Sequence, residues 1–413
     1  MRRQQIQNTL HRFSMEGTNY HKVLNTPCFI LDENELKRSF MGFKEALSAN
    51  FQKSVIGYSV KTNSVPYCLN MAKEMGAFAE VVSYDEYKLA LLCGIQKDHI
   101  IYNGPLKSKS TFLDAISSGA IVNIETKREL QWLKDLDKSK EFSVGLRLNI
   151  NISQISLADA DGNNDNSRFG FSDETDEFVN AVKSINGIPN VKIAGLHIHR
   201  TAHSRSVRFY RHSLRYACDV IKKYSLKLDY IDVGGGFYGI FPNKPTYRQY
   251  SDAFYNVLHE YGLQSLCVIV EPGNALVASC FSFLSEVIDV KHVESDLWFI
   301  TTDGSRNDID PFFRKTSYLN EEIYCNKTPI VKSQIIAGCS CLEYDRLFSL
   351  SNKPLLSIGD RILYHNVGAY TLCLTPLFIR YVPNIYLHTS KHEFILIREK
   401  WTANEYIQKS KIK

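Results

Sequence analysis

The sequence predicts an α/β protein with a (β/α)8 TIM-like barrel and a second, mostly β domain. Two observations carry this prediction. Short apolar segments alternate with amphipathic ones up to about residue 280, and mainly strand-like segments follow. Alternation over ~250 residues implies parallel strands, and eight of them close a barrel. We expect an N-terminal segment at 1–34 that packs on the β domain, a barrel at 35–282, and a C-terminal β-sandwich or β-barrel domain at 283–413.

The elements follow in a regular order. We expect a strand at 27–32 and then a helix at 33–47, whose apolar residues share one face. Further strands are expected at 54–60, 78–83, 99–104, 120–125, 143–150, 192–199, 230–237 and 267–273, and helices at 65–75, 84–94, 127–136, 176–185 and 212–224. The β domain is expected to contain strands at 281–293, 297–303, 329–340, 360–370 and 393–399. An open doubly wound sheet is the competing fold, but the glycine run at 234–236 comes too late in the chain for it.

Length and composition narrow the class of protein. The 413 residues are 44% hydrophobic and 23% charged, which excludes a disordered chain, a collagen-like fibre and a coiled coil. A net charge of +5 is too small at this length to indicate nucleic acid binding. The sequence has no apolar run of about 18 residues, no apolar segment after its basic start and no CxxC pair among ten cysteines. We expect a cytoplasmic protein with reduced cysteines and no membrane partner.

Several residues that could take part in catalysis or binding come directly after predicted strands, where active sites of barrels lie. Lys61 follows an apolar strand, and a desolvated lysine forms Schiff bases with carbonyl groups; a surface lysine is the alternative. The glycines at 234–236 allow backbone N–H groups to approach a phosphate, or form only a tight turn, and they match neither GxGxxG nor the P-loop. Ser83 also ends a strand and is a candidate cofactor contact.

Two further strand ends carry titratable groups. His197 and His199 point to one face of a strand, as half of a metal site or with one ring stacked on a planar cofactor. Because no other ligands have recognisable spacing, we expect no metal. Glu271 ends an apolar strand and needs a partner, such as a protonated ring nitrogen. Cys341, near a turn, and Tyr370, after Gly-Ala, are weak signals alone.

Taken in order, these motifs resemble one family. The order of the motifs resembles that in the pyridoxal-phosphate-dependent fold-type III decarboxylases, which have the alanine-racemase fold. The motifs are VKTN, HIH, GGGF, EPG, the stretch with Gly338, Cys341 and Asp345, and GAY. Within this family, the sequence is most similar to the diaminopimelate and ornithine decarboxylases, and the resemblance covers about residues 25–400. EVVSYDE, YNGPLKS, LRLN, SRFGF and DGSRNDIDP are looser supporting matches.

The resemblance implies roles for individual residues. Lys61 would hold pyridoxal phosphate as a Schiff base, and His199 would stack on its ring. Glu271 would pair with the protonated pyridine nitrogen. The phosphate would be bound by Gly235, Gly236, Gly273 and Tyr370. Cys341 would act as an acid from the neighbouring subunit, which implies a homodimer with the active site at the interface. Lys61, Cys341 and His199 are thus the expected catalytic residues.

The chain departs from the family where the resemblance places substrate contacts. Asn274 and Asp310 stand where diaminopimelate decarboxylases have arginines that clamp a distal carboxylate, and Arg314 replaces a tyrosine. Leu342 replaces an acidic residue that binds a distal amine, and Arg200 adds a positive charge. We therefore expect a decarboxylase for a diamino acid or, preferably, a modified or conjugated amino acid of specialised biosynthesis, such as a siderophore or antibiotic pathway. The alternative is that these residues lie in loops that contact no substrate and have changed without effect on function.

Two other functions are compatible with the resemblance. One is a pyridoxal-phosphate-dependent racemase, which would lack the stretch that contains Cys341 and Asp345. The other is a non-catalytic homologue that acts as a regulator; the presence of every expected catalytic residue argues against it. The sequence contains no nucleic acid motif.

Overall fold

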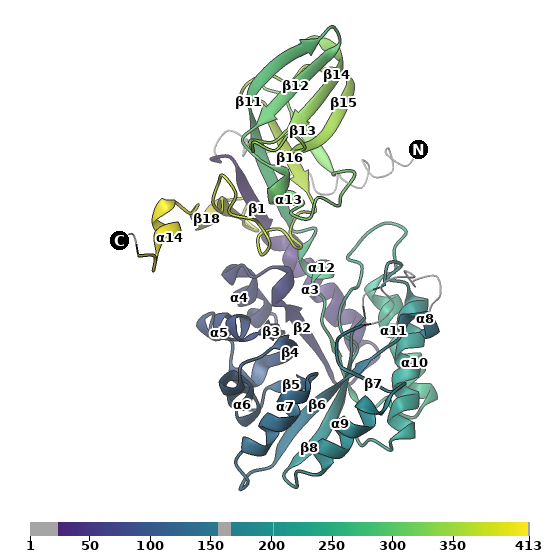
Figure 1. Cartoon of the computed structure of the whole chain (residues 1–413). Helices are drawn as coiled ribbons and strands as arrows, with labels where there is room; N and C mark the ends of the chain where they lie inside the picture. Colours follow the sequence, from purple (N-terminus) through teal and green to yellow (C-terminus); the bar gives the residue numbers. More distant parts are fainter. Residues whose placement is uncertain (1–23, 156–166, 201, 412–413) are drawn as a thin grey trace. The chain divides into compact units, whose positions relative to one another are not determined.

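The computed structural model describes residues 24–155, 167–200 and 202–411, and the chain divides into two compact units (Figure 1). The barrel unit is Lys37–Leu276, and the β unit combines Met1–Leu36 with Val277–Lys413. The predicted boundaries at 34 and 282 differ from these by two and six residues (36 − 34 and 282 − 276). Residues 1–23 of the predicted N-terminal segment lie outside the described residues.

The barrel unit confirms the closed barrel and excludes the open sheet. Its eight strands are all parallel, and β2 pairs with both β3 and β10, so the ring closes. The short strand β7 (Phe171–Ser172) is added beside β6. The ring consists of β2 (Ser54–Ser59), β3 (Phe78–Ser83), β4 (Ile100–Leu106), β5 (Ile121–Ile124), β6 (Phe142–Asn149), β8 (Val191–Ile198), β9 (Tyr230–Asp232) and β10 (Cys267–Val270).

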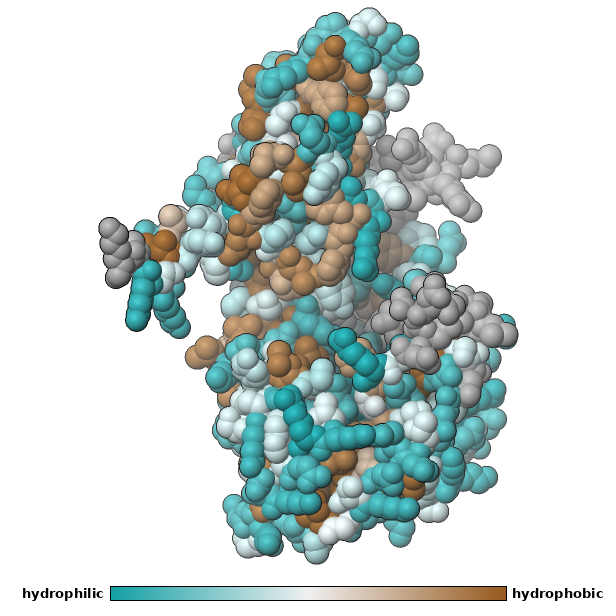
Figure 2. Space-filling view, in the orientation of Figure 1, coloured by the Kyte–Doolittle hydropathy of each residue, from teal (hydrophilic) through white to brown (hydrophobic). Residues whose placement is uncertain are grey.

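Helices follow the strands around the barrel. Several begin at a Ser or Thr whose hydroxyl accepts a backbone N–H, so the chain turns at defined points. Ser206 is such a cap, and it starts α10 five residues before the predicted helix at 212. The face drawn in Figure 2 is largely hydrophilic over this unit. The helices are α3 (Glu33–Ser48), α4 (Pro66–Glu74), α5 (Tyr84–Leu92), α6 (Lys109–Ser117), α7 (Lys127–Trp132), α8 (Ile152–Ile155), α9 (Asp176–Asn186), α10 (Val207–Lys223), α11 (Tyr247–Glu260) and α12 (Asn274–Val277).

The β unit is built on one branched sheet. Its main path runs β15-β14-β12-β11-β1-β17-β18, and β16 pairs with both β11 and β13. The first half of β11 pairs with β1 and β16, whereas its second half pairs with β12. The strands are β1 (Cys28–Asp32), β11 (Phe281–Glu294), β12 (Leu297–Thr302), β13 (Asn320–Ile323), β14 (Ile330–Ala337), β15 (Arg346–Pro354), β16 (Arg361–His365), β17 (Asn384–His388) and β18 (Phe394–Arg398), with short helices α13 (Arg306–Ile309) and α14 (Ala403–Ile407).

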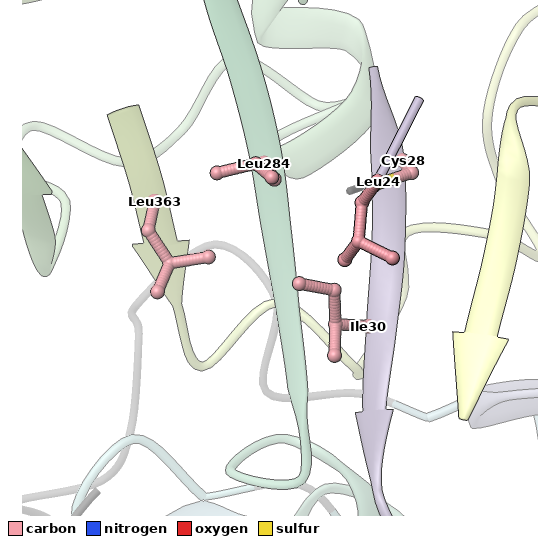
Figure 3. Close-up of a cluster of buried hydrophobic side chains, with 5 residues drawn as sticks. All are labelled: Leu24, Cys28, Ile30, Leu284 and Leu363. Carbon is pink, nitrogen blue, oxygen red and sulfur yellow. The ribbon is translucent and has the colours of Figure 1, made fainter. Parts of the chain in front are cut away.

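The core of the β unit joins segments that are distant in sequence. Leu284 on β11 lies between Leu363 on β16 and Ile30 on β1, with Cys28 and Leu24 beside them (Figure 3). Burial raises the pKa of Cys28 to about 12, so this thiol stays protonated and acts as an apolar side chain. No helix within the described ranges is long and apolar enough to cross a bilayer.

Candidate active site

Lys61 lies at the mouth of the barrel, in a short 3-10 helix (η1, Val60–Thr62) directly after β2. Its Nζ is 2.5 Å from Glu80 Oε2, and the Ser59 hydroxyl donates to the same oxygen at 2.8 Å. The Lys61 side chain is 32% exposed, while that of Glu80 is 1% exposed. A fixed carboxylate therefore holds a reachable amine at the carboxyl end of the strands.

Glu271 follows β10 and lies at the base of the same mouth. Its Oε1 accepts a hydrogen bond from Asn103 Nδ2 at 2.5 Å, and its Oε2 lies 3.5 Å from His197 Nε2. Burial alone would raise the pKa of Glu271, but His197, Lys61 and a hydrogen bond with Asp232 hold it well below its usual range. Glu271 is therefore an ionised, buried carboxylate that can face a cationic group.

Asp232, at the end of β9, is the neutral partner of Glu271. Burial and the adjacent Glu271 raise the pKa of Asp232 well above its usual range. Two carboxyl groups this close do not both ionise, and the pair shares one proton. The other Asp232 contacts are the Gly234 N–H at 2.9 Å and Asn123 Nδ2 at 3.4 Å.

His199, one residue after β8, presents a neutral ring. Its Nδ1 accepts the Gly235 N–H at 3.0 Å, which places the proton of the neutral imidazole on Nε2. Burial, together with the positive charges of Arg147 and Lys61, lowers the pKa of His199 to about 3. The side chain is half-buried, and its ring is near-parallel to that of His197, with centroids 6.4 Å apart. Such a ring offers a flat, uncharged surface for stacking.

The His199 environment predicts how stability depends on pH. The pKa in the folded protein lies below the unfolded value of about 6.5, so unfolding takes up a proton between these values. This contribution is complete above pH 6.5 and is lost as pH falls toward 3, at up to about 1.4 kcal/mol per pH unit. In urea unfolding of the apoprotein from pH 7 to 4, His199→Gln should lose stability less steeply than wild type. Equal slopes would show that the ring is not buried neutral.

The glycine loop after β9 forms a cradle without side chains. A Cβ on Gly235 would lie 2.3 Å from the Glu271 carbonyl oxygen, and Gly236 has φ +92°. The Tyr210 hydroxyl donates to the Gly235 carbonyl at 2.8 Å and fixes the loop. Gly273 packs against η1, because a Cβ there would lie 2.1 Å from Thr62 Oγ1. Side chains are excluded from these positions by close packing, so the loop can present only its backbone to a phosphate group.

Three other residues of the barrel unit were predicted to bind cofactor or substrate: Ser83, Asn274 and Arg200. The Ser83 hydroxyl accepts the Glu86 N–H at 3.1 Å and caps α5. Asn274 begins α12 and is half-buried, as is Arg200 after β8. Their predicted roles in binding cofactor or substrate remain predictions.

The remaining predicted residues belong to the β unit. Cys341 and Arg314 are exposed, Leu342 is half-buried, and Tyr370 is 42% exposed with φ +54°. The loop that carries Cys341 is fixed by Asp345, which accepts hydrogen bonds from Ser305 Oγ, Arg306 N, Ser340 N and Ser340 Oγ. The roles of these residues are predictions as well.

Asp310 is engaged within the β unit. Its Oδ2 accepts from the Arg306 guanidinium at 2.9 Å, the Lys315 N–H at 3.0 Å and the Tyr318 hydroxyl at 3.0 Å, while its Oδ1 accepts the Arg314 N–H at 3.1 Å. The residue is 4% exposed. Its carboxylate therefore already has a full set of donors without a ligand.

The barrel residues fit pyridoxal phosphate. The mouth combines a reachable amine at Lys61, an ionised carboxylate at Glu271, a neutral ring at His199 and a glycine loop that can present only backbone at Gly235. A planar cofactor with an aldehyde, a basic ring nitrogen and a phosphate has one partner for each of these groups.

The same residues do not indicate a metal. Among the described residues, potential ligand atoms cluster in one place, where those of His197, Asp232 and Glu271 lie within 4.8 Å of one another. Asp232 and Glu271 also have protein partners in the Gly234 N–H, Asn123, Asn103 and His197, and we assign no metal to this cluster.

Sequence reasoning missed several residues that build the site. Glu80, Asn103, Asn123 and Asp232 are single polar residues within or at the end of apolar strands, and they are 0–2% exposed. A lone polar residue in a buried strand was the available signal, because such a group needs an internal partner.

Comparisons with known proteins agree with this site. Residues 33–278 match the family model for the pyridoxal binding domain of pyridoxal-dependent decarboxylases. A probable chloroplastic diaminopimelate decarboxylase of Oryza sativa subsp. japonica is 26% identical over 86% of this chain and 73% of its own length. The L-glutamyl-[BtrI acyl-carrier protein] decarboxylase of Niallia circulans is 24% identical over 95% of both chains.

A solved structure has the same fold. Diaminopimelate decarboxylase from M. jannaschii superposes with a TM-score of 0.84 at 22% identity and covers 97% of this chain and 94% of its own. The fold and the site thus define a barrel enzyme that uses pyridoxal phosphate. The chain belongs to the pyridoxal-dependent decarboxylase family. The diaminopimelate decarboxylases compared above are carboxy-lyases that act on an amino acid.

Proposed function

We propose that this enzyme removes the α-carboxylate of an amino acid whose side chain carries an appended group. The observation that carries the proposal is the state of Asp310, whose oxygens are occupied by Arg306, Lys315, Tyr318 and the Arg314 backbone. With Asn274 at the other expected arginine position, neither residue supplies a cation for the distal carboxylate of diaminopimelate. Leu342 likewise supplies no anion for a distal amine.

The barrel residues have defined tasks in this proposal. Pyridoxal phosphate, when bound, supplies an electron sink for the pair left by departing CO₂. Lys61 provides the point of attachment, and Glu80 holds its amine at the mouth. Glu271 stabilises a positive charge on the ring nitrogen, while His199 packs against the ring without adding charge. In this proposal the phosphate lies against the loop of Gly235 and Gly236.

Positive charges near the mouth support an anionic appended group. Arg205 lies just before the N-cap of α10 and Arg208 lies in its first turn, and neither has a carboxylate partner among the described residues. Arg205 and Lys244 both lie over the ring of Tyr238, with centroid distances of 5.3 and 4.7 Å. The Niallia circulans relative acts on a glutamyl group attached to an acyl-carrier protein. We therefore propose a conjugated, anionic substrate of a specialised biosynthetic pathway.

Competition between substrates tests this function. We would measure CO₂ release from glutamyl-4′-phosphopantetheine, meso-diaminopimelate, L-ornithine and L-lysine with the same holoenzyme. The conjugate should have the highest kcat/KM, and Arg205→Gln should lower that value about 10- to 100-fold through loss of a charged contact. Arg211→Gln, at an exposed position in α10, is the matched control. A higher kcat/KM for free diaminopimelate would overturn the proposal.

We also propose a homodimer in which Cys341 of one copy completes the site of the other. The stretch that follows Tyr370 exposes several large apolar side chains, as an interface requires: Leu374, Leu377, Phe378 and Ile379. Isologous pairing of two identical copies would bury this stretch twice.

Mixed dimers test the role of Cys341. Cys341→Ala should lower kcat by about 10²- to 10⁴-fold, as expected for loss of a general acid, while cofactor absorbance stays unchanged. When Cys341→Ala and Lys61→Ala proteins are mixed and allowed to exchange subunits, about a quarter of the wild-type activity should return, because one dimer in two has one intact site. Cys339→Ala is the control on the same loop. No recovery after confirmed exchange would contradict a shared site.

We place the enzyme in the cytoplasm. The structure has all ten cysteines as thiols, and several of them are buried. This pattern is typical of a reducing compartment.

A further inference from the structure

Three buried side chains connect the two carboxylates of the site. The Tyr230 hydroxyl donates to Asn123 Oδ1 at 2.9 Å, and Asn123 Nδ2 donates to Asn103 Oδ1 at 2.9 Å. Asn103 Nδ2 then donates to Glu271 Oε1 at 2.5 Å and to Glu80 Oε1 at 3.1 Å. The chain of bonds crosses from β9 through β5 to β4 and ends on the carboxylates of Glu80 and Glu271.

The direction of these bonds is fixed by chemistry at both ends. Ionised carboxylates only accept, so Asn103 must turn its amide nitrogen toward Glu271 and Glu80 and its oxygen toward Asn123. Asn123 must then turn its own nitrogen toward Asn103, and its oxygen needs a donor. The Tyr230 hydroxyl supplies that donor. Without that donor the Asn123 oxygen would be buried without a partner, which would weaken the hold of Asn123 on Asn103.

The strands leave space for this arrangement. A Cβ on Gly195 of β8 would lie 2.0 Å from Tyr230 Cζ, and one on Gly145 of β6 would lie 1.9 Å from Asn123 Oδ1 and 2.2 Å from the Tyr230 hydroxyl. Only glycine at both positions accommodates the ring and the amide. The barrel interior is therefore shaped around Tyr230 and Asn123.

We propose that Tyr230, Asn123 and Asn103 are positioning residues that hold one amide N–H₂ group between the carboxylate that binds Lys61 and the carboxylate that faces the cofactor ring. We call these three residues the amide relay. It donates to the carboxylates of Glu271 and Glu80 together, in a site whose other charged or titratable groups include Lys61, Glu86, Arg147, His197, His199 and Asp232. The proposal rests on the proposed function for the roles of Lys61 and Glu271.

The test measures the protonation state of the ring nitrogen rather than activity. Pyridoxal phosphate labelled with ¹⁵N in the ring would be bound to wild type, Tyr230→Phe, Asn103→Ala and Glu271→Gln, and the ¹⁵N chemical shift recorded. Tyr230→Phe keeps the ring in its slot and removes only the donor. Its ¹⁵N shift should move from the wild-type value toward that of Glu271→Gln, and Asn103→Ala should move it further. Asn103→Ala should also weaken cofactor binding about 10- to 100-fold.

A matched control separates positioning from stability. The buried Tyr87 hydroxyl donates to Asp114 at 2.7 Å between outer helices, so Tyr87→Phe removes a comparable bond away from the site. It should leave the ¹⁵N shift at the wild-type value. Wild-type shifts in both Tyr230→Phe and Asn103→Ala would overturn the proposal.

Failure of the proposed function would be seen separately, as wild-type protein that binds no pyridoxal phosphate. The amide relay would then be tested in the apoprotein by a double-mutant cycle on urea unfolding. The effects of Tyr230→Phe and Asn103→Ala should be non-additive, because the two side chains act through Asn123. Strictly additive effects would overturn the relay without reference to the cofactor.

Discussion

Lys61→Ala should abolish covalent attachment of pyridoxal phosphate and lower CO₂ release by at least about a thousandfold. The Lys61 amine lies 2.5 Å from Glu80 on a side chain that is 32% exposed, so it is both held in place and reachable. Alanine removes the amine but leaves Glu80, Glu271 and the glycine cradle in place. Non-covalent cofactor binding should therefore persist, while the visible absorbance band of the attached cofactor disappears.

A second lysine controls for general effects of the substitution. Lys53 is exposed just before β2, at the opposite end of the strand from Lys61. Lys53→Ala should keep the absorbance and the CO₂ release of wild type. A Lys61→Ala protein that retains both would show that the cofactor is attached elsewhere.

Glu271→Gln should lower kcat by about 10²- to 10³-fold without loss of the attached cofactor. The carboxylate of Glu271 is the ionised member of its pair with Asp232, and its negative charge is directed at the ring nitrogen in the proposed site. A neutral amide cannot stabilise a proton on that nitrogen. Steady-state kinetics combined with absorbance would separate the loss of charge from the loss of cofactor.

The substitution Asp232→Asn, compared with Glu271→Gln, shows which of the two carboxyl groups carries the negative charge. Asp232 keeps its proton, so an amide that also donates should replace it with less than about a tenfold loss of kcat. The asymmetry between the two substitutions tests which carboxyl carries the charge. Equal losses would contradict the assignment of the charge to Glu271.

The barrel was predictable because its strands and helices alternate with distinct periodicities. The strand predicted at 78–83 is β3 without change, and the strand predicted at 54–60 ends one residue early at Ser59. The strand predicted at 230–237 ends at Asp232, because the glycines that follow take up φ values unsuited to a strand. In the β unit, β13, β15 and β17 were missed. β13 and β17 have only four and five residues, too few for a clear alternation of apolar and polar residues, and the second half of β15 is polar.

The site was predictable only where a residue follows a strand. Lys61, His199 and Glu271 come directly after apolar segments, and the shared end of parallel strands brings them together. Asn103 and Asn123 lie inside strands, and Tyr230 begins one. Whether they face the barrel interior depends on strand register, and their partners come from neighbouring strands. Sequence patterns do not specify that register.

Reduction of the holoenzyme with borohydride, followed by peptide mass mapping, tests the central claim most directly. The account predicts that one lysine per chain acquires the reduced cofactor and that this lysine is Lys61, beside Glu80 at the mouth of the barrel. Label on a different lysine, or no label on a protein saturated with pyridoxal phosphate, would contradict the site described here and the function derived from it.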